Sequence, residues 1–258
     1  MGAEGGKKRV EEGAVWACGR VGGGAEEGRM FKVSNDPAFA AKFWDVIGLY
    51  LDPPEKAVVF CCDEKTQCQA LERTQPCLPL GIGHVKTKSH DYIRHGTTSL
   101  FAALDYATGQ VLHRHHWRHT HREWIAFMKQ IDQATPGDLD IHVIADNYAT
   151  HKHATVKEWL GKHKRIHMHY TPTSSSRMNL VERFFGEITR DCIREGSFGS
   201  VAELERANDA YIARHNEAPK RLVWHAEGAD ILRKVNAARQ TLGLAPYSLD
   251  KPEEKSLD

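Results

Sequence analysis

The sequence predicts an α/β fold with a mixed five-stranded sheet flanked by helices. Two apolar runs, at 57–62 and 140–145, are short and continuous, as expected for central strands buried on both faces. The turn sequence "DYATGQ" at 105–110 separates two further strand-like runs and predicts an antiparallel pair. Toward the C-terminus, helical and strand patterns alternate, which is typical of a layered α/β domain.

The elements are expected in the order helix, three strands, helix, strand, helix, strand and two helices. The first helix, 37–51, begins at Pro37, which suits a first helical turn, and its apolar residues recur at spacings of three and four. The predicted strands are 57–62, 97–105, 110–116, 140–145 and 166–170. The remaining predicted helices are 120–134, 150–163, 178–195 and 200–216.

Composition narrows the class of protein. The 258 residues are 41% hydrophobic, which is enough for a domain with a proper core. The six cysteines match no zinc-finger spacing, and neither a signal peptide nor a membrane-spanning apolar run is visible. We therefore expect a cytoplasmic protein with no membrane partner.

Charge is distributed unevenly along the chain. The formal net charge of +1 counts against a chain that wraps DNA over its whole surface. The stretch 84–122, however, holds eight histidines and six basic residues: Lys86, Lys88, Arg94, Arg114, Arg118 and Arg122. This stretch is either the solvated face of a hairpin or a track for the DNA backbone.

Two acids follow the two apolar runs directly. Asp63 comes after 57–62 and Asp146 after 140–145, so the two carboxylates lie side by side if those strands are neighbours. A single acid at a strand end is more often a helix cap. Two such acids repel each other and must be solvated or share cations.

A third acid lies on the helix predicted at 178–195. Its buried stripe follows a spacing of three and four through Met178, Val181, Phe185, Ile188 and Cys192. Glu182 is about 100° round the helix from Val181, at the border of that stripe. It can therefore reach over the sheet, although a lone glutamate is more often an ordinary surface acid.

The run "HRHHWRHTH" at 113–121 also invites a zinc interpretation. In a strand over 110–116, His113 and His115 share one face, and His116 points to the other. The sequence identifies no third ligand nearby, so a structural zinc site is the weaker reading of this run.

Several long motifs carry a family resemblance. "DNYATHKH", "YTPTSSSRMNLVERFFGEITR", "DEKTQCQALERTQP", "RHGTTSLFAALD" and "YIARHNEAPKRLVW" occur in an order that resembles the DDE transposases of bacterial insertion sequences, the insertion sequence 630 type of the mariner superfamily. The likeness runs from about Phe31 to Arg239. It implies a ribonuclease-H-like catalytic domain and DNA cleavage and strand transfer at the ends of an insertion sequence.

The resemblance also implies the site residues. The catalytic and metal-binding triad would be Asp63, Asp146 and Glu182, with Asp63 bridging two ions. Mg²⁺ suits three carboxylates because it is a hard cation that prefers oxygen ligands, and Mn²⁺ can substitute. Two such ions activate a nucleophile and stabilise the leaving oxygen of a phosphodiester.

Other residues are expected to contact DNA, namely Lys65, Lys86, Lys88, Arg94, Asn147, His151 and Lys152. For Asn147 and His151 the resemblance allows either a supporting role beside Asp146 or a contact with the DNA backbone. His151 could equally be a surface residue at a helix start. The expected partners are double-stranded DNA, as inverted repeats and target, and a possible second copy of the chain.

The domain organisation follows from these patterns. Residues 1–30 hold nine of the 21 glycines and are expected to be disordered or an aberrant N-terminal segment. We expect a helical lead-in at 31–56, the ribonuclease-H-like DDE catalytic domain at 57–217, and a C-terminal helical extension and tail at 218–258. Relatives carry helix-turn-helix modules ahead of the catalytic domain, and no such pattern is visible before Phe31.

Three hypotheses therefore remain open from the sequence. The chain is a transposase catalytic domain, or a truncated, inactive remnant that only binds DNA or dimerises, or a ribonuclease-H-like RNA nuclease. The three acids favour the first, and the apparent lack of DNA-binding modules favours the second.

Overall fold

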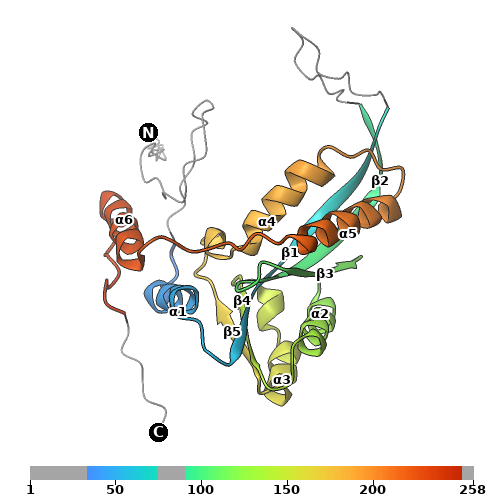
Figure 1. Cartoon of the computed structure of the whole chain (residues 1–258). Helices are drawn as coiled ribbons and strands as arrows, with labels where there is room; N and C mark the ends of the chain where they lie inside the picture. Colours follow the sequence, from blue (N-terminus) through green and yellow to red (C-terminus); the bar gives the residue numbers. More distant parts are fainter. Residues whose placement is uncertain (1–33, 75–90, 252–258) are drawn as a thin grey trace, which may run out of the picture.

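The computed structural model describes residues 34–74 and 91–251. Five strands form one sheet in the order β3-β2-β1-β4-β5, with β1 and β2 antiparallel, β2 and β3 antiparallel, and β1, β4 and β5 parallel (Figure 1). The strands are β1 (Ala57–Arg73), β2 (Tyr92–Asp105), β3 (Val111–His116), β4 (Asp140–Ala145) and β5 (Ile166–Tyr170). The predicted mixed five-stranded sheet is confirmed.

The helices cover both faces of this sheet. In chain order they are α1 (Phe39–Leu51), α2 (His121–Ala134), α3 (Ala154–Lys162), α4 (Val181–Ile188), α5 (Val201–Glu217) and α6 (Gly228–Thr241). One apolar layer joins the sheet to α1, α4, α5 and α6, and a second joins it to α2 and α3. No helix in the described ranges is long and apolar enough to cross a membrane.

Strand alternation assigns each residue of β1 to one of these layers. Val59 and Cys61 pack in the layer of α1 and α4, and Phe60 and Cys62 pack in the layer of α2. Because the side-chain period of a strand is two, Asp63 continues the α4 side and Glu64 the α2 side. The buried thiols Cys61 and Cys62 are unpaired, as the sequence predicts for core cysteines.

Strand β1 differs from the prediction, which ended it at residue 62. The strand continues to Arg73, so Asp63 lies within β1 and not at its end. What does end here is the pairing with β4, whose last partners are Cys61 and Ile144. Beyond that point the described strands leave β1 paired with β2 alone, as far as Arg73 opposite Tyr92. The end of the apolar run at residue 62 therefore marks where β1 loses β4 as a neighbour. It does not mark the end of the strand.

Two predicted helices are also interrupted. The helix expected at 178–195 begins with a 3-10 turn at Ser176–Met178, becomes α-helical at Val181, and ends in a π-helical turn at Thr189–Ile193. The segment 150–163 starts with a 3-10 turn at Ala149–Lys152 before α3 begins at Ala154. Both interruptions lie next to predicted site residues.

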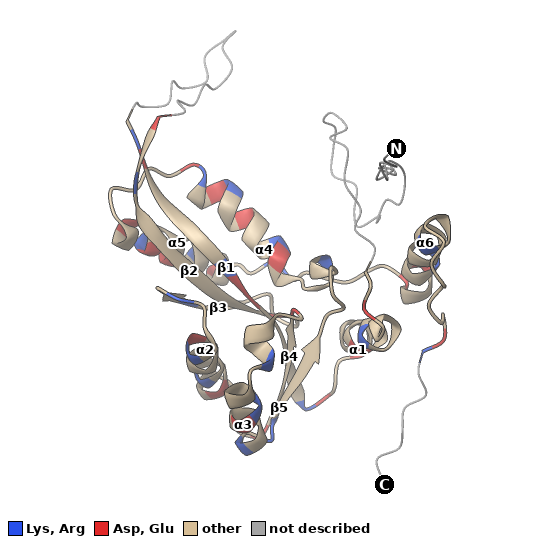
Figure 2. Cartoon of the chain, turned by 180° about the vertical axis from the view of Figure 1, so that it is seen from behind, with Lys and Arg blue, Asp and Glu red and all other residues tan. Residues whose placement is uncertain are grey.

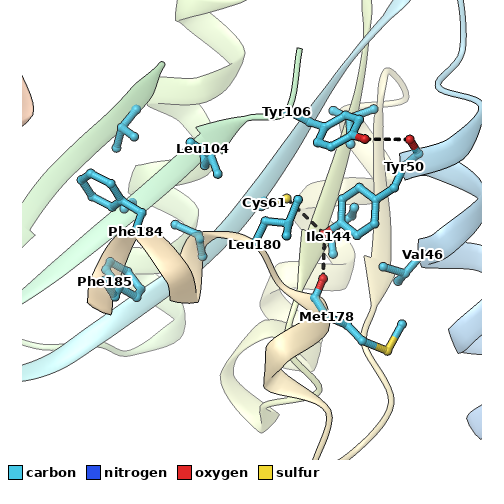
Figure 3. Packing of buried hydrophobic residues seen from close by; sticks show 14 of the residues in the cluster. Val46, Tyr50, Cys61, Leu104, Tyr106, Ile144, Met178, Leu180, Phe184 and Phe185 are labelled. Carbon is cyan, nitrogen blue, oxygen red and sulfur yellow. Dashed lines mark hydrogen bonds between the residues drawn. The ribbon is translucent and has the colours of Figure 1, made fainter. Parts of the chain in front are cut away.

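A hydrogen-bonded group in the core fixes α1 and the segment before α4 against β1. The Tyr50 hydroxyl lies 3.2 Å from the Cys61 sulfur and donates to the Met178 carbonyl at 2.8 Å (Figure 3). Tyr106 donates in turn to the Tyr50 carbonyl at 2.8 Å. These contacts hold the approach to α4 on the face of β1 that carries Asp63.

Candidate active site

Asp63 and Asp146 come from neighbouring parallel strands. Cys61 and Ile144 are the last residues of β1 and β4 that pair, and Asp63 and Asp146 each lie two residues further along the chain. Parallel strands lie about 4.8 Å apart, so the two acids start from adjacent backbones. Asp146 follows the end of β4 directly, as predicted, and Asp63 is buried with 7% of its surface exposed.

Glu182, in the first turn of α4, lies near Asp63 and Asp146. It hydrogen bonds with Asp63, and the charge of Asp146 also acts on it. Its buried neighbours Val181 and Phe185 confirm the predicted position at the border of the apolar stripe. Charges of both signs occur along the exposed side of α4 (Figure 2).

The local electrostatics favour a bound cation. Burial, and then repulsion from Asp146, Glu64 and Glu182, raises the pKa of Asp63 to about 8. Burial and the charge of Asp146 also raise the pKa of Glu182, while Lys65 and the hydrogen bond to Asp63 act against that rise. A group of carboxyl groups that resists ionisation in this way is stabilised when a positive ion binds between them.

The three acids do not converge on one point. Within the described ranges, three ligand atoms come within 4.8 Å of one another only at His113, His115 and Asp209. Each of the three carboxyl groups is nevertheless near enough to the others to act on their ionisation: Asp146 and Glu182 both affect Asp63, and Asp146 also affects Glu182.

His151 contacts the carboxylate of Asp146 from the buried side of the site. Its side chain is fully buried, its Nδ1 lies 3.0 Å from Oδ1 of Asp146, and its Nε2 lies 3.0 Å from Oε2 of Glu64. The ring packs on Trp124, with ring centroids 3.9 Å apart. Burial alone would lower its pKa, but the hydrogen bonds to Asp146 and Glu64 outweigh burial and raise the pKa to about 9. His151 is thus a cation at neutral pH.

The surface position considered for His151 is therefore wrong, and so is the expected DNA contact. A ring with no exposed surface cannot touch a phosphate in this arrangement. The supporting role beside Asp146, the other possibility that the resemblance allows, fits the geometry.

Glu64 and Asn179 complete the site and were not identified from the sequence. Glu64 is the second partner of His151. Asn179 is 1% exposed and donates from its side-chain nitrogen to the Cys62 carbonyl at 2.8 Å, while its own carbonyl accepts from the Glu182 amide at 3.1 Å. It therefore ties the start of α4 to β1 one residue before Asp63. The signal for both residues is their adjacency to the predicted acids in "CCDEK" and "RMNLVE".

The remaining predicted DNA contacts are spread over the molecule. Asn147 donates to Thr173 at 2.8 Å and accepts from Lys152, whose ammonium lies 4.6 Å from the centre of the Tyr170 ring. Lys65 is near enough to Glu182 to influence its ionisation. Arg94 is exposed further along the β1–β2 pair, opposite Leu71. Lys86 and Lys88 lie outside the described residues.

The fold and the position of the three acids can be compared with those of known proteins. The family model described as "DDE superfamily endonuclease" matches residues 58–205, which include all three acids. The chain belongs to this family of endonucleases. A comparison with curated proteins finds no match.

Solved structures of the Mos1 transposase share the fold. The Mos1 mariner paired-end complex with Mn has a TM-score of 0.54 at 12% identity and covers 86% of this chain and 66% of the Mos1 chain. The Mos1 paired-end complex with the left transposon end has a TM-score of 0.52 at 13% identity, with coverage of 74% and 60%. A pre-cleavage Mos1 transpososome gives 0.53 at 12% identity, with coverage of 85% and 65%. The chain thus spans about 60 to 66% of the length of these Mos1 chains.

Proposed function

We propose that the chain acts as the catalytic domain of a DNA transposase. It would cleave phosphodiester bonds at the ends of an insertion sequence and join the freed 3′ ends to target DNA. The observation that supports this most is that three carboxyl groups, from β1, the end of β4 and the start of α4, lie near enough to influence one another's ionisation, with the pKa of Asp63 raised to about 8. Membership of an endonuclease family agrees with it.

We further propose that Asp63, Asp146 and Glu182 hold two Mg²⁺ ions, for which Mn²⁺ can substitute. Three carboxylates are a donor set that hard divalent cations prefer. When bound, such a pair of ions activates the attacking oxygen and stabilises the leaving one. The protein contributes the fixed placement of the acids: β1 positions Asp63, the hydrogen bond from His151 orients Asp146, and Asn179 positions the turn that carries Glu182.

The proposed partner is double-stranded DNA. Lys65 near the acids and Arg94 along the β1–β2 pair are proposed backbone contacts, with Lys86 and Lys88 between these strands in the sequence. Asn147 and Lys152 lie beside Asp146 and form a second polar group at the same edge of the sheet. The similar Mos1 structures are paired-end complexes, which supports a further proposal that two copies of this chain act together.

A plasmid-nicking assay tests the proposal. The purified chain should convert supercoiled DNA to open circles when Mg²⁺ or Mn²⁺ is present, and Asp146→Asn should reduce the rate by at least about 100-fold, because an amide is a poor ligand for a hard cation. Asp140→Asn, at the exposed opposite end of β4, is the matched control and should nick normally.

Two outcomes would contradict the proposal. Equal nicking by Asp146→Asn and wild type would remove the assignment of the acids, and no metal-dependent nicking by wild type would favour an inactive remnant. An RNA–DNA hybrid in the same assay separates the RNA nuclease alternative, which predicts cleavage of the hybrid in preference to duplex DNA.

A further inference from the structure

A second cluster of metal-binding side chains lies on the sheet away from the three acids. His113 and His115 on β3 both approach one oxygen of Asp209 on α5. The Nε2 atom of His113 lies 2.8 Å from Oδ1 of Asp209, and the Nε2 atom of His115 lies 3.2 Å from the same oxygen. The ligand atoms of all three residues lie within 4.8 Å of one another.

The fold explains why these residues meet. His113 and His115 pair with Ala102 and Leu100 of β2, on the sheet face that α5 covers. His116 points to the opposite face, where it contacts Phe101 edge-on at 5.5 Å. Two histidines two residues apart on a strand therefore face the same helix, and α5 supplies the third ligand that the sequence pattern lacks.

We propose that His113, His115 and Asp209 bind Zn²⁺ or a similar transition-metal ion. Two imidazole nitrogens and one carboxylate oxygen, with water in the fourth position, are a common donor set for zinc, whereas Mg²⁺ avoids nitrogen ligands. In a tetrahedral zinc site with bonds of about 2.0–2.1 Å, neighbouring ligand atoms are about 3.3 Å apart. The two histidine–Asp209 separations, 2.8 and 3.2 Å, differ from this value by about half an ångström or less, and the two histidine nitrogens lie within 4.8 Å of each other.

The surroundings leave access for an ion. The side chain of Asp209 is 52% exposed, whereas those of His113 and His115 are 24% and 11% exposed. The two rings are therefore held in place by packing, and the carboxylate side is open to solvent and to a water ligand. Because β3 is an edge strand, a metal ion here would link the end of the sheet to α5.

A simple histidine–carboxylate pair elsewhere in the chain offers a contrast. His95 and Glu72 form a surface pair at 2.6 Å with one ring and one carboxylate. Here two rings aim at a single carboxylate oxygen, so two nitrogen ligands and one oxygen ligand come together where the His95–Glu72 pair brings only one of each. The second histidine thus gives this cluster one more candidate ligand than the pair has.

Zinc binding by the whole chain, stripped of metal with a chelator, tests the inference. Zn²⁺ is titrated in competition with a chromogenic chelator, with excess Mg²⁺ present to occupy the acidic site. Wild type should bind one equivalent, and Asp209→Asn and His113→Gln should each bind it at least about tenfold more weakly. His95→Gln, from the simple pair, and Asp146→Asn, from the acidic site, should bind as wild type does.

Thermal unfolding gives a second readout. Zn²⁺ should raise the unfolding temperature of wild type and of Asp146→Asn but not of Asp209→Asn, because only a bound ion stabilises the folded state. The inference is overturned if wild type binds no zinc under these conditions, or if Asp209→Asn and His113→Gln bind it as tightly as wild type. It is also overturned if Asp146→Asn alone loses the zinc, which would place the ion at the acids.

Discussion

His151 lies between two carboxylates and carries a charge that they stabilise. Its pKa is raised to about 9, so at neutral pH the buried ring is a cation that hydrogen bonds with Asp146 and Glu64. Breaking a buried ion pair from one side is costly, because the remaining charges keep their desolvation penalty without their partner.

We expect His151→Phe to lower the free energy of unfolding by about 3–5 kcal/mol. The apolar ring fits beside Trp124 but donates nothing to Asp146 or Glu64. Urea unfolding measures the loss, and His167→Phe, on the exposed side of β5, should change the stability by less than about 1 kcal/mol. A loss of similar size in both variants would mean that the buried ion pairs are not what His151 contributes.

Sequence reasoning at this scale identified the three acids but not Glu64. Asp63, Asp146 and Glu182 stand out because each follows or borders an apolar pattern. Glu64 can be placed only when β1 is known to continue, because strand alternation then turns it toward His151 and away from Asp63. A strand that ends at residue 62 gives Glu64 no defined direction.

At the scale of elements, the start of α4 depends on one buried amide. Asn179 joins this start to β1 through the Cys62 carbonyl and accepts from the Glu182 amide. Because the helix has only eight residues, its position depends on such anchors more than on its own stability.

We expect Asn179→Ala to cost about 1–3 kcal/mol of stability, since the Cys62 carbonyl loses its side-chain donor. Metal-dependent nicking should fall by more than this loss explains, because Glu182 is no longer held beside Asp63. Asn208→Ala is the matched control, a buried asparagine on α5 away from the acids. Nicking rates of the two variants are compared at a temperature at which both are fully folded, and equal rates would contradict the role of Asn179.

The element boundaries show why the sequence predicts some helices better than others. The helix expected at 120–134 is found at His121–Ala134, where Thr120 and Glu123 form a capping box that can be read from the sequence. The helix expected at 178–195 is divided, because Asn179 and Tyr50 draw the segment 176–180 onto β1. These hydrogen bonds join residues more than a hundred positions apart, so no local sequence pattern predicts them.

For the whole molecule, the acids link stability to pH. An unfolded aspartate titrates near 3.9, but Asp63 in the folded protein titrates at about 8. Between these values the folded state keeps a proton that the unfolded chain has released, so the free energy of unfolding falls as pH rises. His151, with its pKa raised to about 9, adds stability that is present below about pH 6.5 and is lost as pH rises through 9.

We expect the metal-free protein to lose on the order of 5 kcal/mol of stability between about pH 5 and pH 8, most of it from Asp63. Asp63→Asn should remove most of this slope and leave the part that belongs to His151. Excess Mg²⁺ should reduce it in wild type, because a bound cation stabilises the ionised carboxylates. Urea unfolding at several pH values, with a chelator or with Mg²⁺, measures these slopes. Identical slopes in wild type and Asp63→Asn would contradict the assigned pKa.

The fold class could be predicted because each strand and most helices carry their own pattern. The largely apolar runs at 57–62 and 140–145 predict two central strands, and the condition that these strands are neighbours is met, because β1 and β4 pair in parallel. The position of α5 over β3 was not predictable in this way, because Asp209 is 96 residues from His113 and 94 residues from His115 in the sequence. The sequence therefore favoured the acidic site and left the histidine cluster without its third ligand.

The division of β1 between two core layers has a consequence for how this protein can change over generations. Adding or deleting a single residue within 57–62 would exchange the directions of Asp63 and Glu64, and with them the acid that meets α4 and the acid that meets His151. Replacing one apolar residue there by another costs some packing and leaves both directions unchanged. Substitutions between apolar residues in this stretch should therefore be tolerated, whereas insertions and deletions in it should not.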